Sequence, residues 1–206
     1  MNHTDPLKAL VLVCSLSKSP IESSSELLAQ QVLTELEKYN VQGSIVRVVD
    51  HDIKAGVEID MGDGDAWPRI RQQMMDSDIL IIATPIWVGH TCSVAQRVIE
   101  RLDAELSEQD DEGRLLTYGK VGAAVVVGNE DGAHNVCADL FQALNDVGFT
   151  IPAVSGTYWV GEAMNKVDFK DLKETPEMVA SANKSLAANV AHLARLLKAN
   201  PYPPAK

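Results

Sequence analysis

The chain has 206 residues, of which 46% are hydrophobic and 23% charged. This length and composition suit one folded domain over residues 1–206. No apolar stretch reaches the roughly 20 residues that a membrane span requires. The formal net charge of −11 argues against nucleic acid or an anionic membrane as a partner, because both repel an acidic surface. Three widely spaced cysteines and a start without a secretory signal predict a cytoplasmic protein with neither a disulfide framework nor a zinc site.

Short apolar segments alternate with amphipathic ones along the chain. Strands are predicted at residues 9–14, 44–49, 79–84, 122–127 and 151–155. Apolar residues recur with helical period at residues 28–36, 94–102, 136–147 and 186–197. The first, third and fourth strand segments are almost continuously apolar, which is typical of parallel strands covered on both faces. The pattern predicts an α/β fold: an open, doubly wound sheet of five parallel strands with helices on both faces.

The turn after the first predicted strand is rich in serine. Its sequence, SLSKSPIESSS, has a single basic residue, Lys18, and no glycine, so neither the dinucleotide fingerprint nor the Walker pattern is present. Hydroxyls and free N–H groups at a helix N-terminus suit a phosphate, because the helix dipole favours an anion there. We therefore predict a mononucleotide phosphate held by side-chain hydroxyls. Ser23 and Glu26 also match a capping box, which explains these two residues without a ligand, and both interpretations stay open.

Two further loops follow predicted strands at the same edge of the sheet. Pro85 is expected to end the third strand, and Trp87 follows in the loop. The loop after the fourth strand contains two glycines and Asp131, an expected cap for the next helix. In the flavodoxin-like order 2-1-3-4-5, ligands bind where the first and third strands are neighbours, and a phosphate turn beside an aromatic side chain there describes FMN. Trp159 is expected either to close the pocket or to cover the sheet edge.

The chain resembles the flavodoxin-like NAD(P)H-dependent FMN reductases, broadly the flavin-dependent quinone, azo and flavin reductases. The segments that carry the likeness are CSLSKSPIESSSELL, TPIWVGHTCSVAQRVIERLDAEL and GNEDGAHNV. The resemblance implies a phosphate site that includes Ser15, Ser17, Ser23, Ser24 and Ser25, and a ring site lined by Pro85, Ile86, Trp87, Val88 and Gly89. It also implies that the loop formed by Gly128, Asn129, Glu130, Asp131 and Gly132 approaches the pyrimidine side of the flavin. Members of the family often have an arginine in the first loop, where this chain has Lys18, with Glu22 and Glu26 close by.

The resemblance implies an enzyme that passes hydride from NAD(P)H, through flavin N5, to a small acceptor such as a quinone, an azo compound or free flavin. Backbone N–H groups near Gly89 and Gly132 are expected to stabilise the negative charge of the reduced ring. Relatives commonly form homodimers or homotetramers, which we expect here. The alternative is a flavodoxin-type electron carrier without its own substrate. The acidity suits a carrier, but the loop GNEDGAH lacks the aromatic residue that such carriers usually have there.

Candidate catalytic groups are few. His134 is the best candidate for a proton donor, although a histidine in the first turn of a helix is more often a surface residue. The acidic segment 60–65 lacks the spacing of an EF-hand and is expected to be a solvated loop. Arg97 and Arg101 lie one helical turn apart and are expected to pair with Glu100 and Glu105 on the surface, the alternative being contact with an NADPH phosphate.

Overall fold

The structure, a computed structural model, describes residues 5–163 and 165–204. Its main sheet consists of parallel strands β1 (Leu7–Val13), β2 (Val41–Arg47), β3 (Ile79–Trp87), β5 (Val121–Gly128) and β6 (Gly156–Val160). They lie in the order β2-β1-β3-β5-β6, and the two-residue strand β4 (His90–Thr91) pairs antiparallel with the end of β3. Without β4, this is the predicted flavodoxin-like order, in which the strand order reverses between β1 and β3.

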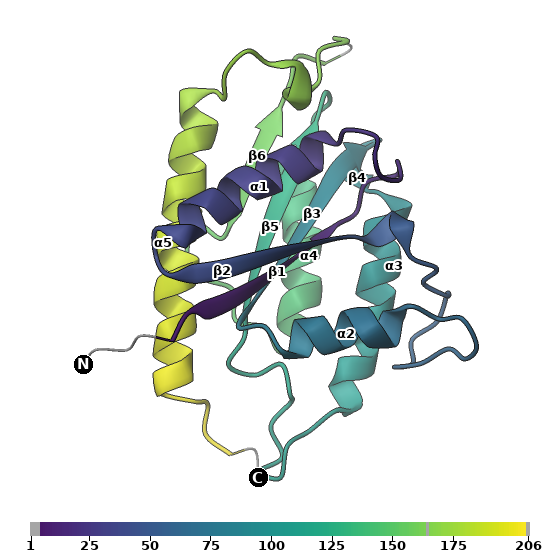
Figure 1. The fold of residues 1–206 in the computed structure, drawn as a ribbon, viewed down its shortest axis with the longest axis vertical. Helices are drawn as coiled ribbons and strands as arrows, with labels where there is room; N and C mark the ends of the chain where they lie inside the picture. The colour runs from purple at the N-terminus through teal and green to yellow at the C-terminus, as the bar shows by residue number, and fades with distance from the viewer. Residues whose placement is uncertain (1–4, 164, 205–206) are drawn as a thin grey trace.

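Helices cover both faces of the sheet, as predicted. Helices α1 (Ser24–Glu37) and α5 (Glu177–Ala199) lie side by side on one face, while α2 (Trp67–Met75), α3 (Ser93–Leu102) and α4 (Ala133–Asp146) cover the other (Figure 1). Short 3-10 turns are η1 (Val48–Asp50), η2 (Asp103–Ser107) and η3 (Phe169–Asp171). Successive strand residues contribute to opposite cores: Val11 packs under α1 and α5, and Leu12 packs towards α2 and α3.

The last strand lies later in the chain than predicted. Residues 151–155 form an irregular connection, and β6 begins only at Gly156. Pro152 cannot donate to a sheet, and Val154 has a φ of +54°, which a strand does not accommodate. Trp159 therefore lies within β6, with 9% of its surface exposed, and packs against Phe169 with ring centroids 5.7 Å apart. Trp159 covers the sheet and does not close the pocket.

The third strand extends past the proline that was expected to end it. The carbonyl of Ala83 accepts a hydrogen bond from the Cys14 N–H at 2.7 Å. Pro85, two residues later, directs its ring nitrogen to the same side, beyond the end of β1, so its missing N–H removes no ladder bond. On its other side Pro85 pairs with Val127. The extension carries Trp87 into the β3–β4 hairpin.

The polar segment between β2 and β3 is more ordered than expected. It ends in helix α2, which the sequence analysis did not predict and which buries Trp67, Ile70 and Met74. The preceding loop wraps around Arg101, whose side chain is wholly buried and bonds the Asp65 carboxylate at 2.7 Å. Arg101 also donates to the carbonyls of three loop residues, Lys54, Glu58 and Ile59.

The expectations for the charged groups of this region were therefore partly wrong. Arg101 does not pair with Glu105 on the surface, because Glu105 is itself buried and bonds Arg71 through both oxygens at 2.7 and 2.9 Å. Asp65 does not belong to a solvated loop. Burial acts to raise its pKa, but hydrogen bonds from backbone N–H groups and from Arg101 outweigh it and lower the pKa to about 2. Arg97 does lie 4.0 Å from Glu100, as expected.

Candidate functional site

A pocket of about 560 Å³ opens at the carboxyl ends of β1, β3 and β5. Its volume falls in the range of about 300–1,000 Å³ that is usual for small-molecule sites. Four segments form its walls: the serine turn after β1, the end of β3, the loop after β5, and residues 165–170 before α5. The position agrees with the rule that open α/β sheets bind ligands where the strand order reverses.

The pocket gathers most of the predicted site residues. The lining includes Ser15, Ser17, Ser23, Ser24, Ser25, Pro85, Ile86, Trp87, Gly128, Asn129 and Glu130. Other predicted residues lie outside the lining: Lys18, Val88, Gly89, Asp131, Gly132 and His134. Residues that the sequence analysis did not select also line it, notably Asn165, Asp168, Phe169 and Lys170.

Helix α1 presents its N-terminus to the pocket. Ser23 is the N-cap, and its hydroxyl accepts a hydrogen bond from the Glu26 N–H at 3.3 Å. Only this half of the expected capping box forms, because the Glu26 carboxylate pairs with Arg47 instead. Glu26 is thereby absent from the pocket lining, whereas Glu22 remains in it. The hydroxyls of Ser24 and Ser25 lie where the helix dipole favours an anion.

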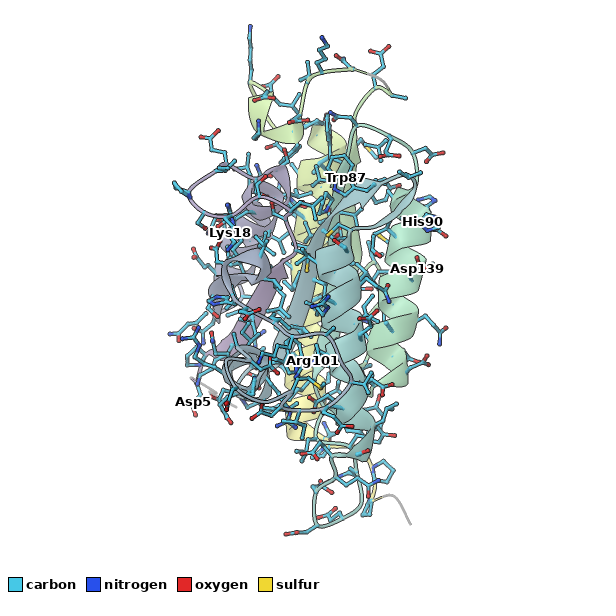
Figure 2. The ribbon with its side chains drawn as sticks, turned by 90° about the vertical axis from the view of Figure 1, so that its right-hand side faces the viewer. Asp5, Lys18, Trp87, His90, Arg101 and Asp139 are labelled. Atoms are coloured by element: carbon cyan, nitrogen blue, oxygen red, sulfur yellow. The ribbon has the colours of Figure 1, made fainter. Side chains whose placement is uncertain are left out.

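The cation that lines the pocket beside these serines is Lys170, and the prediction had placed Lys18 there. Lys18 is exposed on the outer part of its turn and lies apart from Trp87 (Figure 2). The N–H of Lys170 donates to the Ser24 hydroxyl at 3.2 Å, across 146 positions of the sequence. Hydrogen bonding and charge from Asp171, 3.4 Å away, raise the pKa of Lys170, with a further contribution from Asp168 at 3.5 Å. Lys170 therefore carries a positive charge at neutral pH.

The segment that carries Lys170 contains a sequence pattern from which its local structure could have been predicted. Asp168 and Asp171 form a reciprocal capping box around η3, a D-x-x-D pattern that can be found by inspection. Asp168 also accepts a hydrogen bond from the Asn129 side chain at 2.7 Å. This bond ties the segment to the loop after β5, and the buried ring of Phe169 anchors it below. Its place at the pocket depends on these tertiary contacts.

The N–H groups expected to face a reduced flavin already have partners. The Val88 and Gly89 N–H groups donate to the two oxygens of Glu130 at 3.0 and 3.1 Å. The Gly132 N–H donates to Asp131 at 2.7 Å. Gly132 is the N-cap of α4, and no side chain caps that helix, so the expected capping role of Asp131 was wrong.

His134 lies outside the pocket, in a second hollow of about 350 Å³ beside β6. Its Nε2 is 2.9 Å from the hydroxyl of Tyr158, and the two rings meet edge to face. No contact with the first pocket supports its predicted role as a proton donor. Burial raises the pKa of Cys14 well above its ordinary value and that of Cys137 to about 11, so both thiols are protonated and poorly nucleophilic.

Comparison with known proteins agrees with this geometry. The family model described as NADPH-dependent FMN reductase matches residues 7–165. The chain therefore belongs to the NADPH-dependent FMN reductase family and is a flavin-dependent oxidoreductase that uses FMN and NAD(P)H. The pocket fits this cofactor: hydroxyls and a cation at one end suit a phosphate, and an exposed indole beside the apolar side chain of Ile86 suits a flat ring.

Individual relatives share most of this chain. It is 31% identical over 210 residues to the 8-demethyl-8-aminoriboflavin-5'-phosphate synthase of Streptomyces davaonensis, covering 95% of this chain and 80% of that protein. The crystal structure of RosB with bound 8-demethyl-8-formylriboflavin-5'-phosphate has a TM-score of 0.87 and 32% identity, covering 95% of this chain and 82% of RosB.

A third relative is much longer than this chain. The divalent metal cation transporter MntH of Mycobacterium bovis is 33% identical over 202 residues, which span 95% of this chain but only 30% of the transporter. In the part of the chain that the structure describes, no helix combines the length and hydrophobicity that a bilayer crossing requires.

Proposed function

We propose that this protein passes hydride from NAD(P)H, through flavin N5, to a small acceptor such as a quinone, an azo compound or free flavin. The observation that carries the proposal is that one pocket has a polar end suited to a phosphate and an aromatic end suited to a flat ring. One end is lined by Ser24 and Ser25 at the start of α1 and by Lys170, and the other by Trp87 at the end of β3. When bound there, FMN supplies the redox chemistry, accepting and donating hydride at N5.

The chain's own residues bind and orient the cofactor. Ser25, which is 3% exposed, and Ser24 offer hydroxyls beside the free N–H groups of α1, and Lys170 adds a positive charge. The negative charges of Glu22 and Asp168, which also line the pocket, counteract the attraction of these groups for a phosphate. We infer that hydrogen bonds dominate phosphate binding, because charge alone gives little net attraction in this pocket.

The ring site is open to a second molecule. Trp87 is 52% exposed, and the loop after β5, residues 128–132, brings no aromatic side chain to cover a ring from the other side. An uncovered ring face lets nicotinamide and acceptor approach in turn, which favours an enzyme over an electron carrier.

The first experiment is the visible absorbance of the purified protein, before and after addition of FMN, followed by identification of the released flavin. We expect flavin bands and oxidation of NAD(P)H when a quinone is added. A protein that stays colourless with FMN present would contradict the proposal. Reversible one-electron reduction of bound FMN without NAD(P)H turnover would instead support the electron carrier.

A second function is favoured by the 31% identity to a synthase named for a modified riboflavin phosphate. In that case the flavin phosphate is the substrate and not a resident cofactor. Mass spectrometry of the flavin recovered after turnover distinguishes the two functions. An unchanged mass of FMN supports the reductase, and a changed mass supports chemistry on the flavin itself.

A further inference from the structure

The β3–β4 hairpin turns through a residue that is poorly suited to its backbone conformation. Trp87 pairs with His90, so Val88 and Gly89 form a two-residue loop. Their φ angles are +53° and +76°, positive at both positions as in a type I′ turn. Glycine adopts such angles freely, but a β-branched residue does so only under strain. The Val88 side chain is 84% exposed, so packing does little to hold it in this conformation.

A carboxylate from another loop holds this turn. In a two-residue hairpin the loop N–H groups have no partners within the ladder, and here both donate to Glu130, at 3.0 and 3.1 Å. A carboxylate that accepts two N–H groups forms charge-assisted bonds, which are among the stronger hydrogen bonds in proteins. The arrangement uses both oxygens of Glu130, so neither is left without a partner.

The loop after β5 and the first turn of α4 support the hairpin turn at two further points. The side-chain amide of Asn135 donates to the Gly89 carbonyl at 3.1 Å. A Cβ atom added to Gly132 would lie 2.7 Å from the Gly89 Cα, so only glycine allows the two loops to approach this closely. Residues 130–135 therefore form one surface against which the hairpin turn rests.

We propose that Glu130 is a positioning residue: its carboxylate fixes the strained turn and thereby holds Trp87 at the pocket. The proposal rests on the proposed function, because it assigns Trp87 to the flavin ring. Glu130 lines the pocket, but both its oxygens bind the turn, so it acts on the cofactor through Trp87. This role differs from the predicted approach of Glu130 to the pyrimidine side of the flavin.

Amide hydrogen exchange of Val88 and Gly89, measured by NMR without added flavin, tests the clamp directly. In the wild-type protein both N–H groups should exchange slowly in spite of their exposed position. Glu130→Ala should accelerate their exchange by about tenfold or more, because no other acceptor replaces the carboxylate. Glu130→Gln, which keeps one acceptor oxygen, should lie between the two. Equal exchange rates in the wild type and Glu130→Ala would overturn the proposal.

The matched control is Asp139→Ala, which removes an exposed carboxylate from α4 (Figure 2). This variant should leave the exchange of both N–H groups and the affinity for FMN unchanged. A change as large as that of Glu130→Ala would show that lost negative charge, and not the clamp, is responsible, and would overturn the proposal.

Titration with FMN connects the clamp to the site. Glu130→Ala should raise the dissociation constant by about tenfold and shift the spectrum of bound flavin in the same way as Trp87→Ala. Adding Val88→Asn, which suits a type I′ turn, should restore part of the affinity. Accelerated exchange with unchanged affinity and spectrum would refute the positioning role. Failure of the wild type to bind FMN would refute the proposed function and the ring assignment of Trp87, while exchange would still report whether Glu130 holds the turn.

Discussion

Two polar regions of this protein differ in how their polar groups are used. Around Arg101, the guanidinium bonds one carboxylate and three carbonyls, and Asp65 in turn accepts three backbone N–H groups. Both side chains are wholly buried. The charge of each is therefore balanced within the protein, and this region orders the loop before α2.

The pocket shows the opposite arrangement. Ser24 and Ser25 stand at a helix N-terminus whose first N–H groups have no intrahelical acceptors, and the ammonium of Lys170 pairs with two partly exposed carboxylates. The pocket therefore keeps hydrogen-bonding groups available for another molecule. A polar cluster that stabilises the fold thus differs from one that can bind a ligand in how far its polar groups are already paired within the protein.

The largest effect is expected at the buried pair. Arg101→Ala leaves the Asp65 carboxylate buried without its partner, which typically costs about 3–5 kcal/mol. Urea denaturation monitored by circular dichroism should show this loss of unfolding free energy. Lys38→Ala, at an exposed lysine 2.7 Å from Glu35, is the control and should cost well under about 1 kcal/mol. A loss of similar size in both variants would mean that the buried pair has no special role.

At the pocket, replacing Ser24 and Ser25 together by alanine should weaken FMN binding by about 1–3 kcal/mol, the range for hydrogen bonds to a charged group. Binding of riboflavin, which lacks the phosphate, should change little. Isothermal titration calorimetry with both flavins measures the difference. Equal losses for the two flavins would show that the serines act as structural caps and do not contact the phosphate.

A smaller effect is expected at the strained turn. Val88→Asn should raise the unfolding free energy by about 1 kcal/mol, because asparagine tolerates positive φ better than valine. Val88→Ile keeps the β-branched side chain and should bring no gain. If thermal unfolding places both variants at the same stability as the wild type, the turn stores no measurable strain.

The smallest expected effect distinguishes the two lysines. Lys170→Gln should weaken FMN binding a few-fold at low salt, and the difference from the wild type should shrink as salt screens the charge. Lys18→Gln should leave the affinity unchanged, because Lys18 lies outside the pocket lining. The reverse order of effects in a fluorescence titration would restore the original prediction for Lys18.

The local sequence pattern predicted the fold more accurately than it predicted where the individual strands and helices begin and end. The continuous apolar runs that became β1, β3 and β5 were recognised because both their faces are buried. The short strand β6 was misplaced, because residues 151–155 and β6 have similar apolar content and only Pro152 and the Val154 backbone distinguish them. Helix α2 was missed because its nine residues have an Arg- and Gln-rich outer face, which leaves few apolar positions to reveal the period.

The sequence by itself determined that the loops after β1, β3 and β5 meet at the pocket. Alternation of strands and helices implies a parallel sheet, and parallel strands place the turns that follow them at one edge. Ser24, Ser25, Pro85 and Trp87 could be selected on this basis, since each lies directly after a recognisable strand or at the start of a helix.

Only the tertiary structure decided which groups complete the site. Lys170 reaches Ser24 across 146 positions, and Glu130 reaches Val88 across 42, and no local periodicity encodes such pairings. The same holds for Arg101 and Asp65, which are 36 positions apart. A buried charge and an exposed one look alike in a sequence, because burial depends on how distant segments pack, and packing fixed the partners of all these residues.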